Sequence, residues 1–103
     1  MPVYNKLVRD KILEIIKDNG QKSTHKILTA DEYAVELTKK LVEEVEEYKK
    51  DKNTDELADI MEVVYALANL HGCTVEELEK IRAEKAEKRG GFEKRIFLVE
   101  VMD

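Results

Sequence analysis

Acidic side chains recur at helical spacing in two neighbouring stretches of the chain. Glu44 and Glu47 are three residues apart, and so are Glu56 and Asp59. Residues three apart lie on the same face of a helix. Carboxylates gathered on one face suit hard divalent cations, which prefer oxygen ligands. These acids are therefore candidate metal ligands.

The same acids project into the apolar sides of their helices. At about 100° per residue, Glu44 falls inside the arc made by Tyr33 and Leu37 and their apolar neighbours. Glu56 and Asp59 fall among the apolar residues of the next helix. Burying an unpaired carboxylate is costly. The pattern therefore predicts a counter-charge close to these acids.

The order of helices indicates how the two acidic stretches meet. We expect helices at residues 9–18, 29–50, 53–71 and 74–89, and Thr29 and Glu32 have capping-box spacing at the start of the second. The short connection around residues 50–53 predicts that the second and third helices form an antiparallel hairpin. Glu47 is then level with Glu56, and Glu44 with Asp59. With helix axes about 8–10 Å apart, the four carboxylates can converge, and Mg²⁺ is the usual cation for such a group.

Composition favours a mostly α-helical fold in a single domain, residues 1–103. The chain has 103 residues, with only four Gly and one Pro. Both residues are poor helix formers, and their scarcity is typical of helical proteins. The tail "RIFLVEV" is rich in β-forming residues, so we expect one short terminal strand there, with "PVY" near the start as its partner.

Charge and cysteine content exclude several classes of protein. The formal net charge is -5, which argues against a nucleic-acid surface. The single Cys73 excludes an intrachain disulfide and is typical of the reducing cytoplasm. No apolar run reaches transmembrane length and no signal peptide is visible, so we expect no membrane partner.

Two other interpretations of the acids remain to be weighed. Glutamate-rich helices place acids at these spacings by chance, as solvated surface. A di-iron centre also uses bundle carboxylates, but it needs Glu-x-x-His on two helices. Neither His25 nor His71 stands at such a position, and the di-iron interpretation is set aside.

The acidic motifs together resemble those of a known family. "EEVEE" (residues 43–47) followed by "ELAD" (residues 56–59) resembles the EExxE…ExxD signature of the all-α nucleoside triphosphate pyrophosphohydrolases. These are the MazG-like proteins and their relatives, including phosphoribosyl-ATP pyrophosphohydrolase. "YNKLVRDKI" and "KRGGFEKRIFL" look like the flanking motifs of a short-chain subgroup described as predicted house-cleaning pyrophosphatases. The resemblance spans nearly the whole chain and implies a MazG-like helical bundle built on the hairpin.

The resemblance also implies a reaction and a set of site residues. The reaction is hydrolysis between the α and β phosphates of a nucleoside triphosphate, with Mg²⁺ or Mn²⁺ as cofactor. The metal ligands map onto Glu44, Glu47, Glu56 and Asp59, with Glu43 as a further catalytic acid. One departure is the gap between Glu47 and Glu56, which is shorter than in many MazG domains. Substrate-contacting loop residues of longer relatives are therefore not carried over.

A triphosphate also needs cationic side chains. We expect substrate contacts from Lys40, at the edge of the acidic face, and from three residues of the flanking motifs, Lys6, Arg9 and Arg89. Lys11, Lys88 and Arg95 are further candidates.

Assembly and function leave alternatives open. Val35 and Val42 lie on the far side of the second helix and need apolar cover. Relatives of this kind generally assemble as dimers or tetramers, so we expect a homo-oligomer. The alternatives to the house-cleaning enzyme are a non-catalytic nucleotide- or metal-binding module, a purely structural helical oligomer, and a phosphoribosyl-ATP pyrophosphohydrolase.

Overall fold

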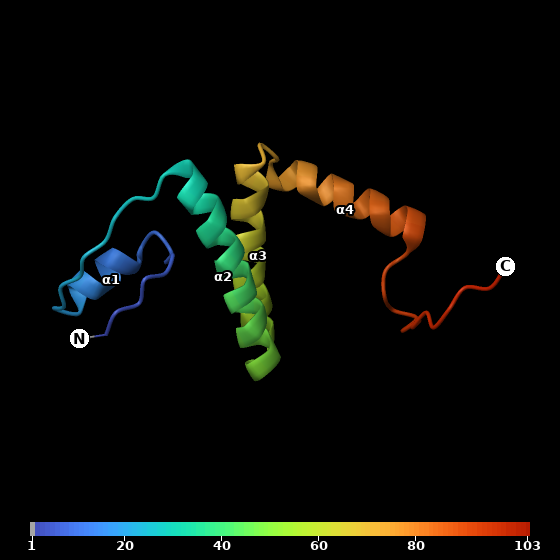
Figure 1. Ribbon diagram of the computed structural model, residues 1–103, viewed down its shortest axis with the longest axis horizontal. Helices are drawn as coiled ribbons and strands as arrows, with labels where there is room; N and C mark the ends of the chain where they lie inside the picture. The colour runs from blue at the N-terminus through green and yellow to red at the C-terminus, as the bar shows by residue number, and fades with distance from the viewer. Residues whose placement is uncertain (1) are drawn as a thin grey trace.

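The computed structural model describes residues 2–103, so the first residue of the predicted 1–103 domain lies outside the described part. It contains four helices, shown in Figure 1: α1 (Ile12–Asp18), α2 (Ala30–Asp51), α3 (Thr54–Leu70) and α4 (Val75–Arg89). The described residues include no strand. The prediction of a helical fold is confirmed. Among these helices, none has the length and apolar character needed to cross a membrane.

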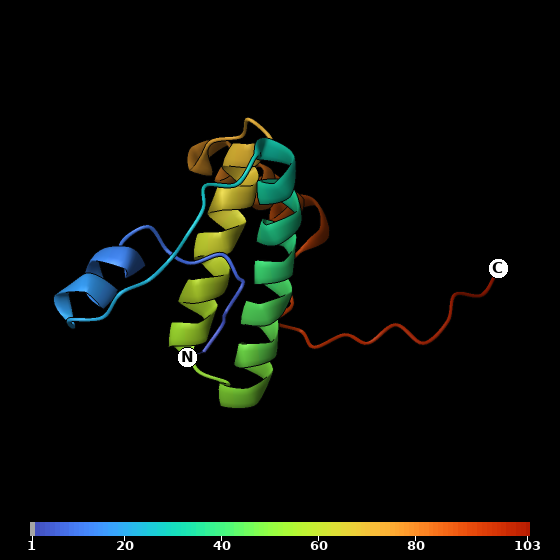
Figure 2. The same cartoon turned by 60° about the vertical axis from the view of Figure 1, so that its left-hand side comes forward.

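An antiparallel hairpin of α2 and α3 is the centre of the molecule. The two helices pack along their length (Figure 2) and are joined through Lys52 and Asn53 alone. Lys52 adopts the left-handed conformation, with φ of 50°, which reverses the chain direction after α2. The Asn53 side chain then accepts a hydrogen bond of 3.1 Å from the backbone N–H of Glu56 and begins α3. This short connection fixes the register of the two helices.

The other end of the hairpin begins with a capping box. Thr29 Oγ1 accepts a hydrogen bond from the backbone N–H of Glu32, and the Glu32 carboxylate accepts one from the backbone N–H of Thr29. The predicted capping box is therefore confirmed. It satisfies backbone donors that the first turn of α2 would otherwise leave unpaired.

The core of one chain is small. Leu37 of α2 and Val63 and Ala68 of α3 are its buried apolar residues. Large apolar side chains such as Val35, Val42 and many in the tail are exposed. The radius of gyration is 18.2 Å, whereas a compact domain of this length has about 13 Å. One copy of the chain is therefore extended, and much of the apolar surface of its central hairpin is exposed.

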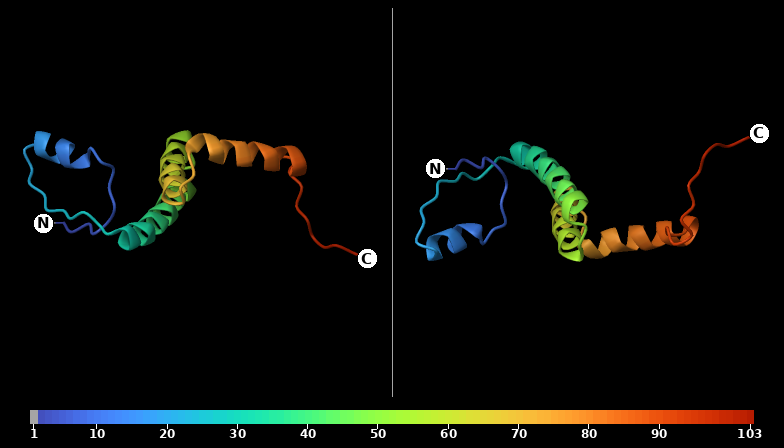
Figure 3. Two further views of the ribbon diagram at one scale, coloured as in Figure 1. Left: turned by 90° about the horizontal axis from the view of Figure 1, so that it is seen from above. Right: turned by 90° about the horizontal axis from the view of Figure 1, so that it is seen from below.

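The outer helices lie on opposite sides of the hairpin (Figure 3). α4 contacts α3, and within residues 2–103 α1 contacts no other helix. α1 begins at Ile12 rather than at Arg9, because Arg9 lies in a turn whose carbonyl accepts a hydrogen bond from the backbone N–H of Ile12. Arg9 is therefore held before the helix instead of within it.

The predicted terminal strand pair is wrong for the part of the chain that the structure describes. The tail after Arg95 is extended, and its apolar side chains are exposed. "PVY" lies on the opposite side of the hairpin from this tail (Figure 1). Because a strand needs a neighbouring backbone for its N–H and C=O groups, neither segment can form a strand without a partner.

The small core predicts a strong effect of truncating its most buried residue. Leu37 is 3% exposed, so Leu37→Ala should lower the free energy of unfolding by about 2–5 kcal/mol. Chemical denaturation followed by circular dichroism measures this loss. The control is Ile27→Ala, which truncates an exposed residue outside the helices. Equal losses in the two variants would contradict the assignment of the core.

Candidate metal centre

Three carboxylates from two helices meet on one side of the hairpin. Glu44 comes from α2, and Glu56 and Asp59 come from α3. Each offers one oxygen, and these oxygens lie within 4.8 Å of one another. We call these residues the first acid group. They meet because the short connection places Glu44 level with Asp59, and because Glu56 and Asp59 are one turn apart.

A second acid group lies closer to the hairpin turn. It consists of Glu47, Asp51 and Glu56, whose oxygens also lie within 4.8 Å of one another. Glu56 thus belongs to both groups. Asp51 is not among the residues predicted from the sequence, although it stands four residues after Glu47 and so shares its helix face. That spacing was the signal that could have identified it.

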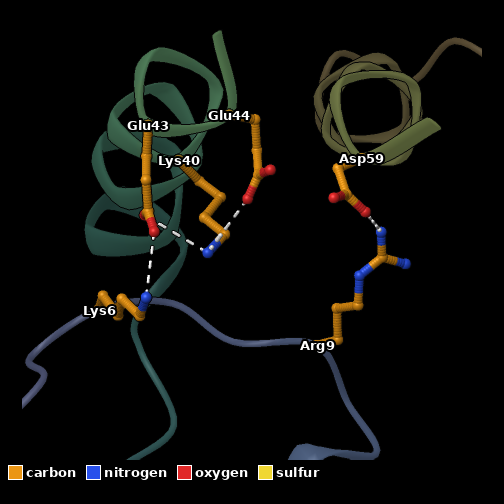
Figure 4. Close-up of polar contacts among 6 residues, drawn as sticks. All are labelled: Lys6, Arg9, Lys40, Glu43, Glu44 and Asp59. Atoms are coloured by element: carbon orange, nitrogen blue, oxygen red, sulfur yellow. Dashed lines mark hydrogen bonds and ion pairs between the residues drawn. The ribbon is translucent and has the colours of Figure 1, made fainter. Parts of the chain in front are cut away.

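Lys40 supplies one counter-charge from within α2. Its ammonium lies 3.5 Å from the Glu44 carboxylate and 3.4 Å from that of Glu43. The side chains of Lys40 and Glu44 are only 17% and 12% exposed. Figure 4 shows the lysine between the two glutamates. This burial agrees with the expectation that Glu44 faces the apolar side of its helix. The counter-charge for the Glu44 carboxylate comes from the chain itself, in the form of Lys40.

The N-terminal segment (residues 2–11) supplies two more cations. Arg9 Nη2 donates a hydrogen bond of 2.7 Å to Asp59 Oδ1, across 50 positions of sequence. Lys6 Nζ donates one of 3.1 Å to Glu43. Both contacts appear in Figure 4, and they reach different helices of the hairpin. The predicted substrate-binding residues Lys6, Arg9 and Lys40 therefore all lie beside the acids.

Arg89 does not lie beside the acids of α2 and α3. It ends α4, which projects away from the hairpin (Figure 1). Within residues 2–103 no ion pair joins it to the acids of α2 and α3. The structure of one copy of the chain does not bring Arg89 beside the acids, and its predicted substrate contact stays a prediction.

Glu56 has mainly acids for neighbours. Within the described chain it forms no ion pair with a cation. Its pKa is raised above the ordinary glutamate value by loss of solvation, and then by Asp51, Asp59 and Glu47. Loss of solvation and the neighbouring acids therefore both oppose the ionisation of Glu56, the residue that both acid groups share.

The pKa of Glu43 is shifted in the opposite direction to that of Glu56. Partial burial, the largest single influence, would raise its pKa, but the ammonium groups of Lys6 and Lys40 together outweigh it and lower the pKa. Glu43 is therefore held as a carboxylate next to the first acid group. It belongs to neither acid group.

The donor set fits a hard divalent cation. Both groups, as found in residues 2–103, contain only carboxylates. Oxygen ligands suit Mg²⁺, Mn²⁺ and Ca²⁺, whereas zinc and iron sites usually include His or Cys. Glu44, Glu56 and Asp59 could hold one such ion together, and Glu47 could contribute from the second group. Their role as ligands stays a prediction.

Comparison with known proteins gives no template for this site. No family model, curated protein or solved structure matches the chain. The chemistry of the site is therefore inferred from the types, distances and charges of its side chains.

The raised pKa of Glu56 predicts a gain in stability when its charge is removed. A raised folded-state pKa makes the ionised form unfavourable to folding, so stability is lost as pH rises through that pKa. Glu56→Gln should therefore melt at a higher temperature than the wild type in EDTA at neutral pH. The difference should close below pH 4.5, the ordinary glutamate value.

The same variant should lose the stabilisation that Mg²⁺ gives the wild type, since a ligand has been replaced. Differential scanning fluorimetry with and without Mg²⁺ measures both effects. Glu62→Gln is the control, because Glu62 is an exposed acid of α3 outside both acid groups. A lower melting temperature for Glu56→Gln in EDTA would contradict the assigned repulsion.

Proposed function

We propose that this chain is a Mg²⁺-dependent nucleoside triphosphate pyrophosphohydrolase, which produces a nucleoside monophosphate and pyrophosphate. One observation carries the proposal: the carboxylates of Glu44, Glu56 and Asp59 meet within 4.8 Å, from two different helices. The resemblance of "EEVEE" and "ELAD" to the MazG-like signature supports the same assignment. The flanking motifs favour non-standard nucleotides as substrates.

The bound cation would neutralise phosphate oxygens and activate a water molecule. In the reaction, the water oxygen attacks the α-phosphorus, the bond from this phosphorus to the bridging oxygen breaks, and pyrophosphate leaves. A nearby base must accept the proton of the water. Glu43 is our candidate for this base, because Lys40 joins it to Glu44 of the first acid group while Glu43 itself belongs to neither acid group.

Cations beside the acids would bind the phosphates. Lys6 and Arg9 lie on the exposed side of the acids, with roughly half of each side chain open to solvent. The guanidinium of Arg9 can contact two phosphate oxygens at once. Lys40 is more deeply buried and is better placed to balance Glu43 and Glu44.

A non-catalytic binding module is the second candidate, and one observation favours it. Lys40 and Arg9 already pair with Glu44 and Asp59. The chain therefore neutralises part of its own acidic face, as a structural ion-pair network would. Such a module would bind a nucleotide or a metal without turnover.

A pyrophosphate-release assay separates the two candidates. The screen covers standard and modified nucleoside triphosphates and phosphoribosyl-ATP, each with Mg²⁺ and with Mn²⁺. We expect metal-dependent release that falls at least about 100-fold in Glu56→Gln and in Asp59→Asn, since each loses a charged ligand. Glu62→Gln should retain wild-type activity. Nucleotide binding without release would favour the binding module and contradict the proposed enzyme.

We further propose that the chain functions as a homodimer or homotetramer. Three buried apolar residues make a small core, whereas Val35 and Val42 of α2, Ile81 of α4 and many apolar residues of the tail are exposed. The extended shape leaves these surfaces open. Burial of apolar surface is the main favourable term in folding. Contact with further copies would bury the apolar surface that one copy leaves exposed.

Sedimentation equilibrium tests this assembly. We expect at least twice the mass of one chain at micromolar concentration. Val42→Asp, which places a charge on an exposed apolar position of α2, should weaken association at least about tenfold, because a charge would be desolvated at the contact. Ser23→Asp adds the same charge at an exposed polar position outside the helices and is the control. A monomeric wild type would contradict the proposal.

A further inference from the structure

The N-terminal segment is attached to the acidic side of the hairpin at two points. Lys6 reaches Glu43 on α2, and Arg9 reaches Asp59 on α3. Figure 4 shows both side chains extending from one stretch of backbone toward different helices. α1, which follows directly, makes no contact with another helix in the described chain. These two ion pairs therefore contribute to the position of residues 2–11.

The two attachment points differ in one respect. Asp59 belongs to the first acid group, whereas Glu43 belongs to neither group. The Arg9 guanidinium lies 2.7 Å from an Asp59 oxygen, where a cation held by this group would also draw on the carboxylate. Arg9 and a divalent cation therefore compete for Asp59. Lys6 has no such competitor at Glu43.

The Arg9–Asp59 pair is also easy to exchange. The two side chains are 56% and 40% exposed, and ion pairs with this exposure add little stability. A divalent cation carries twice the charge of a guanidinium and interacts with all three carboxylates. Electrostatics therefore favours its replacement of Arg9 at Asp59.

We propose that Arg9 is a removable counter-ion, whose release from Asp59 accompanies the binding of a divalent cation to the first acid group. The N-terminal segment is then detached at Arg9 and stays attached at Lys6. The freed guanidinium becomes available to an anionic group, such as the phosphates of the substrate. This inference rests on the metal site proposed above and adds a coupling between its occupancy and the N-terminal segment.

Coupling of this kind is reciprocal. If the cation weakens the Arg9–Asp59 pair, then loss of the pair must strengthen cation binding by the same factor. The opposite sign holds if Arg9 merely orients Asp59 for the metal, since its loss would then weaken binding. The direction of the change therefore distinguishes a competitor from a positioning residue.

Titration with Mn²⁺ measures this direction. The electron paramagnetic resonance signal of free Mn²⁺ gives the dissociation constant for the full-length wild type, Arg9→Gln and Arg82→Gln. Arg82→Gln removes the same charge and an exposed ion pair, with Glu79, from α4, outside both acid groups. We expect Arg9→Gln to bind about two- to fivefold tighter than Arg82→Gln at low ionic strength. Equal or weaker binding in Arg9→Gln would overturn the proposal.

Trypsin digestion measures the detachment directly, without reference to activity. Cleavage of the Lys11–Ile12 bond, followed by mass spectrometry, should become about two- to fivefold faster when Mg²⁺ is added to the wild type. Arg9→Gln should be cleaved at the faster rate without metal. The Arg95–Ile96 bond in the exposed tail is the internal control for protease activity. A wild type that binds metal with no change at Lys11 would overturn the proposal.

The outcomes separate this inference from the metal site on which it depends. A wild type that leaves the Mn²⁺ signal unchanged at millimolar protein would overturn the proposed site and the release of Arg9 together. A wild type that binds Mn²⁺, with unaltered affinity in Arg9→Gln, would overturn only the release of Arg9.

Discussion

Carboxylates from two packed helices repel one another, and the arrangement of charges around the hairpin follows from this repulsion. Glu44, Glu56 and Asp59 approach within 4.8 Å, a separation at which like charges interact strongly when partly shielded from water. Two cations of the same chain reduce this repulsion: Lys40 pairs with Glu44, and Arg9 pairs with Asp59. Glu56 is left among acids, and loss of solvation together with these acids raises its pKa. Some of these carboxylates are neutralised by cations and Glu56 is not. This difference distinguishes the acidic face from an ordinary solvated surface, where water hydrates each charge.

The repulsion is sustained because the hairpin fixes the register of its helices. The connection through Lys52 and Asn53 is too short to allow α3 to slide along α2. Leu37 and Val63 pack between the helices and hold them together. A shift of one helical turn would separate Glu44 from Asp59 by about 5 Å along the axis. Backbone geometry at the turn and apolar packing near the middle therefore determine where the acids meet.

The hairpin was predictable because it depends on local signals. The Thr29 capping box, the acid spacing and the short connection could all be identified over a few residues, and they led to Glu44 level with Asp59. The roles of these acids as ligands remain predictions. Other features depend on contacts that spacing does not encode. Arg9 contacts Asp59 across 50 positions of sequence. Nothing in the residues next to either of them indicates this contact. The tail was predicted as a strand from its composition, but a strand also needs a paired backbone, which composition cannot supply.

The exposed tail after α4 affects how copies of the chain behave when crowded together. Ile96, Phe97, Leu98 and Val99 are consecutive, β-prone and open to solvent. Unpaired segments of this type are templates for irregular aggregation. Charged residues on either side, Arg95 and Glu100, act as gatekeepers against such stacking. The two flanking charges therefore oppose pairing of this segment between copies, and neutralising both would favour aggregates over ordered assembly.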